Sequence, residues 1–199
     1  PDLYLTHFPL ANAYTIGTER PIVVLNSELV RILDSDGQRI VLAHEAAHIQ
    51  SDHVLYRTAL LILMQIGSAA RLPFLAGLPL MAIRMALLEW SRAAELSCDR
   101  AAALVTRDPQ AVCQALMVLA AGEAAEDLNL DAFVAQGMDY EISGSGFERL
   151  TKLMQDLNVT HPMPVRRVRL LLDWVREGDY DRMVRGDYLR RGEEAPARD

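Results

Sequence analysis

The sequence has little of several features that would indicate other classes of protein. Cysteine occurs twice, at Cys98 and Cys113, without a Cys-x-x-Cys pair, which argues against a disulfide framework and favours a reducing compartment. A single bridge between these two cysteines stays open. The net charge of −7 offers no basic surplus that could attract a polyanion, so we expect no nucleic acid partner.

Long hydrophobic runs are also missing. Residues 54–90 are the most apolar part, but three arginines and two prolines interrupt them. The longest stretches without a charge, Thr58–Ala70 and Leu72–Ile83, are shorter than the roughly 20 apolar residues that cross a bilayer. We therefore expect buried helices, or a hairpin that contacts a membrane or a partner. The segment 72–81 has the composition of a flap that could cover a cleft.

The length and the apolar content predict one folded domain. Of the 199 residues, 51% are hydrophobic, and we expect a single domain over residues 1–191 with a disordered tail at 192–199. The sequence begins at Pro1 without a basic and then apolar leader, so we expect a fragment from which an upstream targeting or membrane segment could be missing. We expect a cytoplasmic location, with association at the inner face of a membrane.

Local patterns predict an α+β fold that is mostly helical, with a small antiparallel sheet. Two short strands are predicted at residues 12–17 and 21–25, with a turn between them. Ser35 and Gln38 have the spacing of a capping box, which predicts a helix from about Asp36 to Met64. Further helices are predicted at residues 26–33, 84–107, 108–122, 131–137, 147–157 and 162–177, and a loop at 143–146.

The stretch VLAHEAAHIQSDH, residues 41–53, places polar side chains within an apolar helix. His44 and His48 are four residues apart, so their side chains share one helix face and could bind one metal ion. Zinc suits two imidazoles and a carboxylate, with water in the fourth position. Glu45 would stand beside that water and take its proton. In the alternative interpretation, the histidines cap buried carbonyl groups and Glu45 is solvated.

A third metal ligand is predicted in the stretch SRAAELSCDRAA. Glu95 and Asp99 are four residues apart on a predicted helix and share a face. One carboxylate could bind zinc while the other accepts the N–H of a ligating histidine. These acids could equally belong to a solvated helix face.

The remaining histidines and Cys98 are weaker candidates. His53 lies nine residues beyond His44, which on one continuous helix turns it away from the face of that histidine. His161 precedes a predicted helix, where a loop could carry it into a cleft. We expect Cys98 to be a small core residue, although its thiolate would compete as a zinc ligand.

Five segments together resemble one group of zinc metallopeptidases. Their order and spacing are similar to those of the group that includes HtpX, the mitochondrial Oma-type proteases and the CAAX prenyl endopeptidases, which are gluzincins. The resemblance covers roughly residues 10 to 175 and implies a zincin-like metallopeptidase fold, with the sheet beside the His-Glu-x-x-His helix. The segments are NAYTIG (12–17), PIVVLNSELVRIL (21–33), LAHEAAHIQSDH (42–53), AELSCDRAA (94–102) and THPMPVRRVRLL (160–171).

The resemblance implies a role for each residue that matches a zinc-site motif. His44, His48 and Glu95 would bind one zinc ion. Glu45 would act as the general base and later as the proton donor. Asp99 would orient a ligating histidine, His44.

The resemblance also implies residues that contact the substrate. Asn12, Ala13 and Tyr14 would lie on an edge strand with which an extended substrate peptide pairs. His161 would donate a hydrogen bond to the tetrahedral oxyanion, and Arg167 would brace it.

Two departures from the family pattern affect these expectations. Known members carry transmembrane helices between the zinc motif and the third ligand, whereas arginine and proline interrupt that interval here. We therefore expect peripheral membrane or protein contact through residues 54–90. Arg166 occupies a position at which the family usually has an acid.

The favoured function is a zinc-dependent endopeptidase that hydrolyses peptide bonds of protein or peptide substrates. An alternative is a latent or catalytically silent zinc-binding domain that contacts a protein or a membrane. A fourth protein ligand, such as Cys98 or His161, would favour this alternative. A third interpretation is an aminopeptidase, in which Glu89 could anchor the free amine of the substrate.

Overall fold

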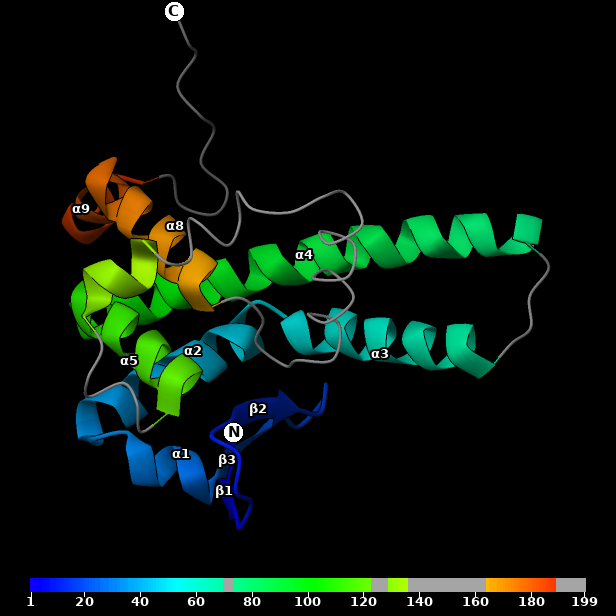
Figure 1. Ribbon diagram of the computed structural model, residues 1–199, viewed down its shortest axis with the longest axis horizontal. Helices are drawn as coiled ribbons and strands as arrows, with labels where there is room; N and C mark the ends of the chain where they lie inside the picture. The colour runs from blue at the N-terminus through cyan, green and yellow to red at the C-terminus, as the bar shows by residue number, and fades with distance from the viewer. Residues whose placement is uncertain (70–73, 123–128, 136–163, 189–199) are drawn as a thin grey trace, which may run out of the picture.

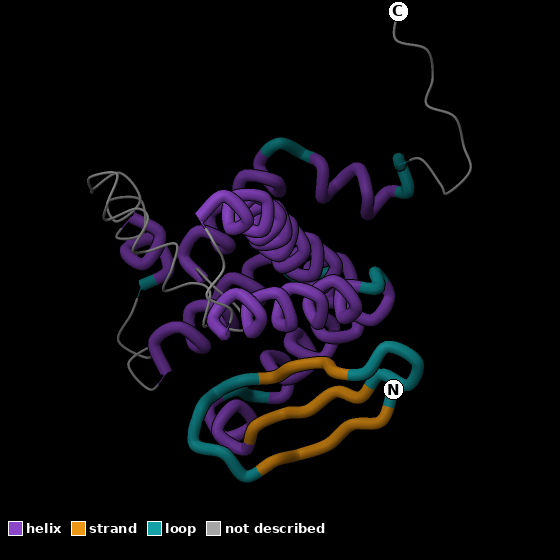
Figure 2. Tube along the Cα trace, turned by 90° about the vertical axis from the view of Figure 1, so that its right-hand side faces the viewer, coloured by secondary structure: helices purple, strands orange, loops and turns teal. Residues whose placement is uncertain are grey.

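The computed structural model describes residues 1–69, 74–122, 129–135 and 164–188. Figure 1 shows two long helices, α3 and α4, side by side, with the shorter helices gathered at one end of α4. Figure 2 shows the three strands as one layer beside the helices. The elements are β1 (Asp2–Thr6), β2 (Ala13–Ile16), β3 (Ile22–Asn26), α1 (Ser27–Ile32), α2 (Ser35–Gln50), α3 (His53–Ala69), α4 (Phe74–Thr106), α5 (Pro109–Ala121), α8 (Pro164–Arg176) and α9 (Asp179–Arg185). Residues 130–135 are also helical.

The strands form a mixed sheet in the order β1-β3-β2. The predicted antiparallel pairing is confirmed for β2 and β3, with Ala13 opposite Leu25. The strand β1 was not predicted, and it pairs parallel with β3, so the sheet is not antiparallel throughout. A parallel neighbour needs a long connection instead of a tight turn, so no local hairpin signal identifies it.

The start of α2 differs from the prediction by one residue. Asp34 is the N-cap instead of Ser35, because its carboxylate accepts a hydrogen bond from the Gly37 N–H at 2.8 Å. Gln38 does not complete a capping box, since its amide donates to the carbonyl oxygen of Leu33 at 2.9 Å. This bond ties the end of α1 to the first turn of α2 and fixes how α2 enters the core.

The helix predicted from Asp36 to Met64 is two helices. α2 ends at Gln50, and Asp52 has a φ of 54°, a left-handed conformation that interrupts the helix before α3 begins. Aspartate tolerates this conformation better than most residues. Beyond this interruption, His53 Nδ1 lies 3.2 Å from His48 Nδ1. The expectation that His53 points away from the predicted site was therefore wrong.

The helices α3 and α4 form a hairpin that extends beyond the other helices, as Figure 1 shows. Among the described residues, no helix is both long enough and apolar enough to cross a membrane. The prediction of a flap was wrong for residues 74–81, which form the first turns of α4 at the far end of the hairpin. Residues 72–73, the predicted loop at 143–146, the predicted helix at 147–157 and the tail at 192–199 lie outside the described residues.

The helix α5 begins and ends as its sequence predicts. Asp108 caps it by accepting a hydrogen bond from the Ala111 N–H at 2.9 Å, with Pro109 in the first turn. Gly122 ends it with a positive φ of 60°. The buried side chains of α5 pack against α4 and α8.

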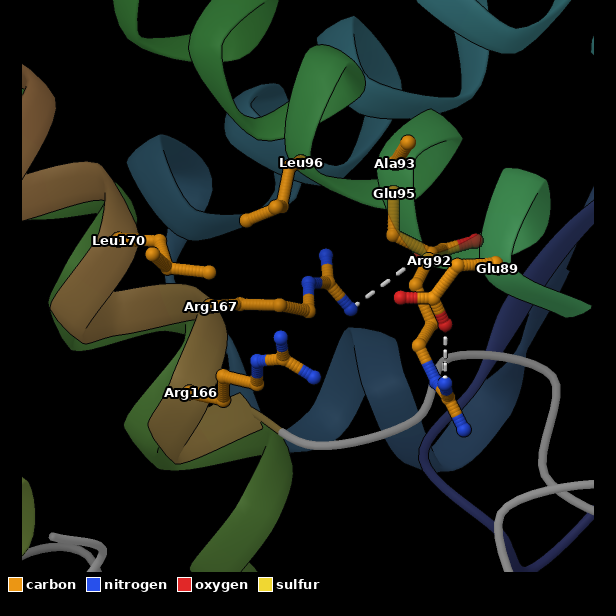
Figure 3. Close-up of a pocket in the computed structure, with 8 residues that line it drawn as sticks. All are labelled: Glu89, Arg92, Ala93, Glu95, Leu96, Arg166, Arg167 and Leu170. Atoms are coloured by element: carbon orange, nitrogen blue, oxygen red, sulfur yellow. Dashed lines mark hydrogen bonds and ion pairs between the residues drawn. The ribbon is translucent and has the colours of Figure 1, made fainter. Parts of the chain in front are cut away.

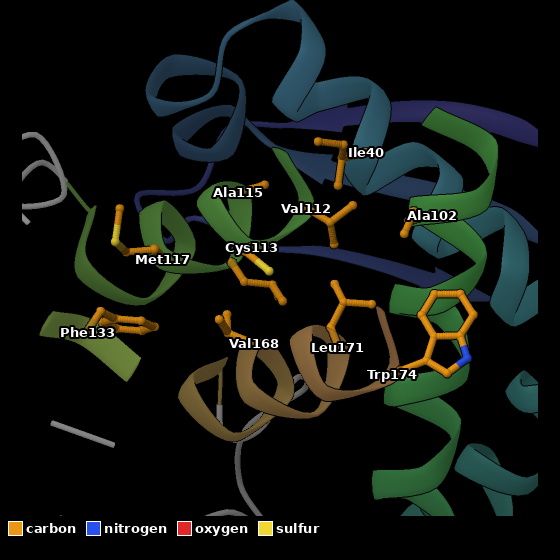
Figure 4. Close-up of a cluster of buried hydrophobic side chains, with 12 residues drawn as sticks. Ile40, Ala102, Val112, Cys113, Ala115, Met117, Phe133, Val168, Leu171 and Trp174 are labelled. Carbon is orange, nitrogen blue, oxygen red and sulfur yellow. The ribbon is translucent and has the colours of Figure 1, made fainter. Parts of the chain in front are cut away.

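The main hydrophobic core lies where α2, α4, α5 and α8 meet, as Figure 4 shows. Leu171 and Trp174 anchor α8 against this core, and this packing brings the first turn of α8 alongside the second half of α4. A second core, which includes Leu25 and Val41, seats the sheet on α2. The buried members of the main core are Ile40, Ala102, Ala103, Val112, Cys113, Ala115, Leu116, Met117, Phe133, Val168, Leu171 and Trp174.

Candidate metal and catalytic site

Three polar side chains of α2 are buried. His44, Glu45 and His48 are exposed by 7%, 1% and 4%. The Nε2 atoms of the two histidines lie 3.2 Å apart, so the prediction that they share one helix face is confirmed. The alternative in which Glu45 is solvated was wrong.

Glu95 of α4 faces both histidines. One of its carboxylate oxygens lies 3.4 Å from His44 Nε2, and the other lies 3.4 Å from His48 Nε2. A zinc ion bonded to two imidazoles at about 2.0–2.1 Å in tetrahedral geometry separates their nitrogens by roughly 3.3 Å. The observed separation of 3.2 Å therefore matches a shared ion. Two imidazoles and one carboxylate are also a donor set that suits zinc.

Asp99, one helical turn after Glu95, connects His44 to α8. Its Oδ1 lies 3.0 Å from His44 Nδ1, the nitrogen that donates its N–H when Nε2 faces a metal. The guanidinium of Arg167 donates to Oδ2 at 2.7 Å and to Oδ1 at 2.6 Å. Burial acts to raise the pKa of Asp99, but the charge and hydrogen bonds of Arg167 hold that pKa below its ordinary value. Asp99 is therefore a fixed carboxylate behind His44.

The two histidines differ in their electrostatic surroundings. Burial acts to lower the pKa of His44, but its hydrogen bonds to Asp99 and Glu95 outweigh burial and raise the pKa to about 9. Burial prevails at His48, where the pKa is lowered. The acids that stabilise a positive charge on His44 would also favour a metal cation at the same point.

Arg167 is bonded to the acids of the site. Its side chain is buried, and besides the bidentate contact with Asp99 it lies 3.2 Å from Glu95 Oε2. Burial acts to lower the pKa of Arg167, but the neighbouring acids outweigh burial and raise that pKa, so the guanidinium stays charged. The predicted contact of Arg167 with His161 stays a prediction, because His161 lies outside the described residues.

Two further side chains, His53 and Cys98, lie against His48. The Nδ1 atom of His53 is 3.2 Å from His48 Nδ1 and 3.5 Å from the sulfur of Cys98. Candidate ligand atoms of His44, His48 and Cys98 lie within 4.8 Å of one another, so distance alone would allow the thiol to join a metal site. We favour Glu95, because each of its carboxylate oxygens lies 3.4 Å from a histidine Nε2 and because burial raises the pKa of the Cys98 thiol, which disfavours the ligating thiolate.

Thr15 is a site residue that the sequence patterns did not single out. From β2, its hydroxyl donates a hydrogen bond to Glu45 Oε2 at 2.8 Å, and both side chains are buried. The alternation of buried and exposed residues along β2 could have identified Thr15. Thr15 shares a face with Ala13, which is also buried, so a polar side chain points into the core.

The segment predicted to hold substrate lies at the edge of the sheet. β2 has β3 on one side and packs against α2, which carries the histidines. Asn12 directly precedes β2, and its carbonyl oxygen accepts a hydrogen bond from the Asn26 N–H at 2.9 Å. Ala13 and Tyr14 are the first residues of the strand. Within the described residues this strand lies at the edge of the sheet, and its contact with a substrate stays a prediction.

A cavity of about 200 Å³ lies between α4 and α8 next to the acids, as Figure 3 shows. Arg167 extends from α8 toward Glu95 in this view, and Arg92 of α4 forms an ion pair with Glu89. Since Glu89 is paired with Arg92, its contacts do not favour the role of an anchor for a free amine. The cavity is lined by Glu89, Arg92, Ala93, Glu95, Leu96, Arg166, Arg167 and Leu170.

The fold and the site together define a class of protein. A His-Glu-x-x-His helix, an acid pair on a second helix and a small sheet beside them are the features of a zincin-like metallopeptidase. A sequence model of peptidase family M48 matches residues 3–175, and the chain belongs to this family. The resemblance found from the motifs is therefore confirmed. Membership implies a metal cofactor.

Two relatives illustrate the range of the family. The chain is 37% identical over 190 residues to the plastoglobule-localized metallopeptidase 48, chloroplastic, of Arabidopsis thaliana, across 93% of this chain and 55% of the relative. It is 28% identical over 207 residues to the protease HtpX homolog of Burkholderia mallei, across 91% of this chain and 70% of the relative. The chain thus spans about half the length of the plant relative. No solved structure gives a significant match.

Proposed function

We propose that this chain is a zinc-dependent endopeptidase that hydrolyses peptide bonds of protein or peptide substrates. The observation that carries the proposal is the convergence of His44, His48 and Glu95 from two helices, with Glu45 buried beside them. Burying this many ionisable groups is costly in a core that serves only packing. The arrangement is therefore better explained by a metal and its chemistry.

One zinc ion per chain would be held by His44, His48 and Glu95. When bound, zinc polarises a carbonyl group and makes water acidic enough to lose a proton near neutral pH. Asp99 accepts the N–H of His44, which keeps the Nε2 lone pair directed at the metal position. Arg167 holds Asp99 in place through two hydrogen bonds.

Glu45 acts as the general base and then as the general acid. Its carboxylate takes a proton from the attacking water and passes it to the amine that leaves. His161 would donate a hydrogen bond to the oxyanion that forms on the scissile carbonyl, with Arg167 as its support.

A substrate peptide would lie extended beside Asn12, Ala13 and Tyr14. Pairing through main-chain hydrogen bonds makes few demands on the substrate sequence. It also requires no chain terminus, which suits an endopeptidase. Clearance or processing of unfolded proteins fits such a mode of binding.

The alternative function is a latent or silent zinc-binding domain. The observation that favours it is the proximity of the Cys98 thiol to both histidines. A thiolate in the fourth position would close the site to water, as in structural zinc sites. The raised pKa of the buried thiol opposes this arrangement.

The second part of the proposal concerns the hairpin of α3 and α4, which would contact a membrane surface from the cytoplasmic side. Leu55, Ile62 and Ile83 expose about half of their surface there. Between Asp52 and Glu89 the sequence has three arginines and no acid, although the whole chain has a net charge of −7. Apolar side chains with local positive charge suit an anionic lipid surface.

The first experiment measures zinc by elemental analysis and hydrolysis of unfolded casein, for the wild type and for Glu45→Gln. We expect one zinc ion per chain in both proteins and a loss of activity of roughly 100-fold or more in the variant, since only proton transfer is removed. Glu19→Gln is the matched control, because Glu19 is exposed in the turn between β2 and β3.

The outcomes separate the two functions. Zinc in both proteins with no cleavage by either would favour the silent domain. Cleavage that survives in Glu45→Gln would remove Glu45 from the mechanism. Absence of zinc from the wild type after expression in zinc-supplemented medium would overturn the central proposal.

A further inference from the structure

Thr15 links the edge strand to Glu45. Its hydroxyl lies 2.8 Å from Glu45 Oε2, and the carbonyl oxygen of Glu45 is 3.5 Å away. A hydroxyl has one proton to donate, and the shorter distance assigns that proton to the carboxylate. Thr15 is exposed by 6% and Glu45 by 1%, so water does not easily replace this bond.

The main-chain N–H and C=O groups of Thr15 point away from β3. The hydrogen bond from the Asn26 N–H to the Asn12 carbonyl makes these two residues a hydrogen-bonded pair of the antiparallel ladder. Because such pairs alternate along the strand, Tyr14 also points its main-chain groups at β3, whereas Ala13 and Thr15 point theirs at the outer edge. The outer edge is the side on which a substrate strand would pair.

We propose that Thr15 is a positioning residue that couples the substrate strand to the general base. The proposal rests on the proposed function and deepens it. The main chain of Thr15 pairs with the substrate, and its hydroxyl fixes one oxygen of Glu45. The Glu45 carboxylate is thereby held in a fixed position relative to the scissile bond of a peptide that pairs with β2.

The physical basis is the geometry of proton transfer. A general base must lie within hydrogen-bond reach of the proton it takes, and a small displacement of the base lowers the rate strongly. A glutamate side chain has several rotatable bonds, and the hydroxyl of Thr15 restrains the end of this side chain. Without it, Glu45 would lose orientation while the strand kept its main-chain pairing. The effect should therefore fall on kcat and leave KM nearly unchanged.

The test compares Thr15→Val, which keeps the shape and removes the hydroxyl, with Thr15→Ser, which keeps the hydroxyl. We expect kcat on a fluorogenic peptide to fall roughly tenfold or more in Thr15→Val, with KM within about twofold, and to recover in Thr15→Ser. Thr106→Val is the matched control, because the Thr106 hydroxyl also bonds inside the protein, to the Ala102 carbonyl at 2.8 Å.

A second measurement does not depend on activity. A crystal structure of Thr15→Val should show the Glu45 carboxylate displaced or in more than one conformation, with β2 and β3 paired as before. An unmoved carboxylate, or a kcat equal to that of the wild type, would overturn the proposal. A rise in KM alone would assign Thr15 to substrate binding only. A wild type without activity would contradict the proposed function, and the crystal structure would still decide the role of Thr15.

Discussion

The body of the protein and the α3–α4 hairpin differ in which kinds of side chain they bury and which they expose. In the body, which comprises α2, α5, α8 and the part of α4 from Glu95 onward, the charged groups around His44 are buried and paired. In the hairpin, which comprises α3 and the part of α4 before Glu95, apolar groups are exposed, with Leu55 at 55% and Ile62 at 52%. Because α4 belongs to both, one helix carries acids of the candidate metal site in its second half and exposed apolar side chains in its first.

Both arrangements cost free energy, and this is why each indicates a function. A buried ion costs several kcal/mol unless partners compensate for lost hydration. Exposed apolar side chains keep water ordered around them and favour contact with another apolar surface. Substitutions in the body should therefore change stability, metal binding and activity together. Substitutions in the hairpin should change only binding to a surface.

The largest effect on stability should follow Arg167→Met, which keeps the length of the side chain and removes its charge. Asp99 and Glu95 would then be buried acids without their cation. We expect the free energy of unfolding to fall by about 3–5 kcal/mol, as measured by urea denaturation at pH 7.

The control for this prediction lies on the same helix. Arg176→Met removes a guanidinium that is 76% exposed and paired with Asp173, and it should cost less than about 1 kcal/mol. The double variant Arg167→Met with Asp99→Asn should lose less than the sum of the single changes, because both remove the same contact. Equal losses for Arg167→Met and Arg176→Met would contradict a buried network that supports the body.

The residues of the site that follow helix periodicity could be predicted from the sequence. His44 with His48 and Glu95 with Asp99 are each spaced by four, and a helix converts that spacing into a shared face whatever surrounds it. The bounds of α5 were predictable for the same reason, because Asp108 and Gly122 act on their own helix. Local geometry determines both features.

The contacts that depend on tertiary packing could not be predicted. Thr15 meets Glu45 because the sheet packs on α2, and no spacing along the chain encodes that contact. His53 meets His48 because one residue, Asp52, adopts a left-handed conformation and interrupts the helix between them. The strand β1 joins β3 across a long connection, so its parallel pairing leaves no local pattern either.

A smaller effect should follow removal of the contact behind His48. When Nε2 of His48 binds a metal, its Nδ1 donates to His53 Nδ1 at 3.2 Å, and that bond orients the ring. We expect His53→Leu to weaken zinc binding by about tenfold, measured by competition with a chromogenic chelator. His53→Gln keeps an acceptor and should weaken binding less.

His7→Leu is the control for the effect at His48, because His7 is exposed and its side chain contacts Ser27 instead of His48. It should leave the zinc affinity unchanged. An unchanged affinity in His53→Leu would show that the ring of His48 is held by packing alone. The residues that support metal binding would then lie on α2 and α4 and would not include His53 of α3.

The smallest effect on the body should follow the double change Leu55→Ser and Ile62→Ser in the hairpin. Both side chains are more than half exposed, so the unfolding free energy should change by about 0.5 kcal/mol or less for each, and hydrolysis of a short peptide should be unchanged. Cosedimentation with vesicles that contain anionic lipid should fall several-fold. Val105→Ser, which alters a residue 68% exposed in the body part of α4, should leave vesicle binding as it was. Equal losses of vesicle binding in the double variant and in Val105→Ser would contradict the distinction between hairpin and body. Exposed apolar residues of either region would then support vesicle binding.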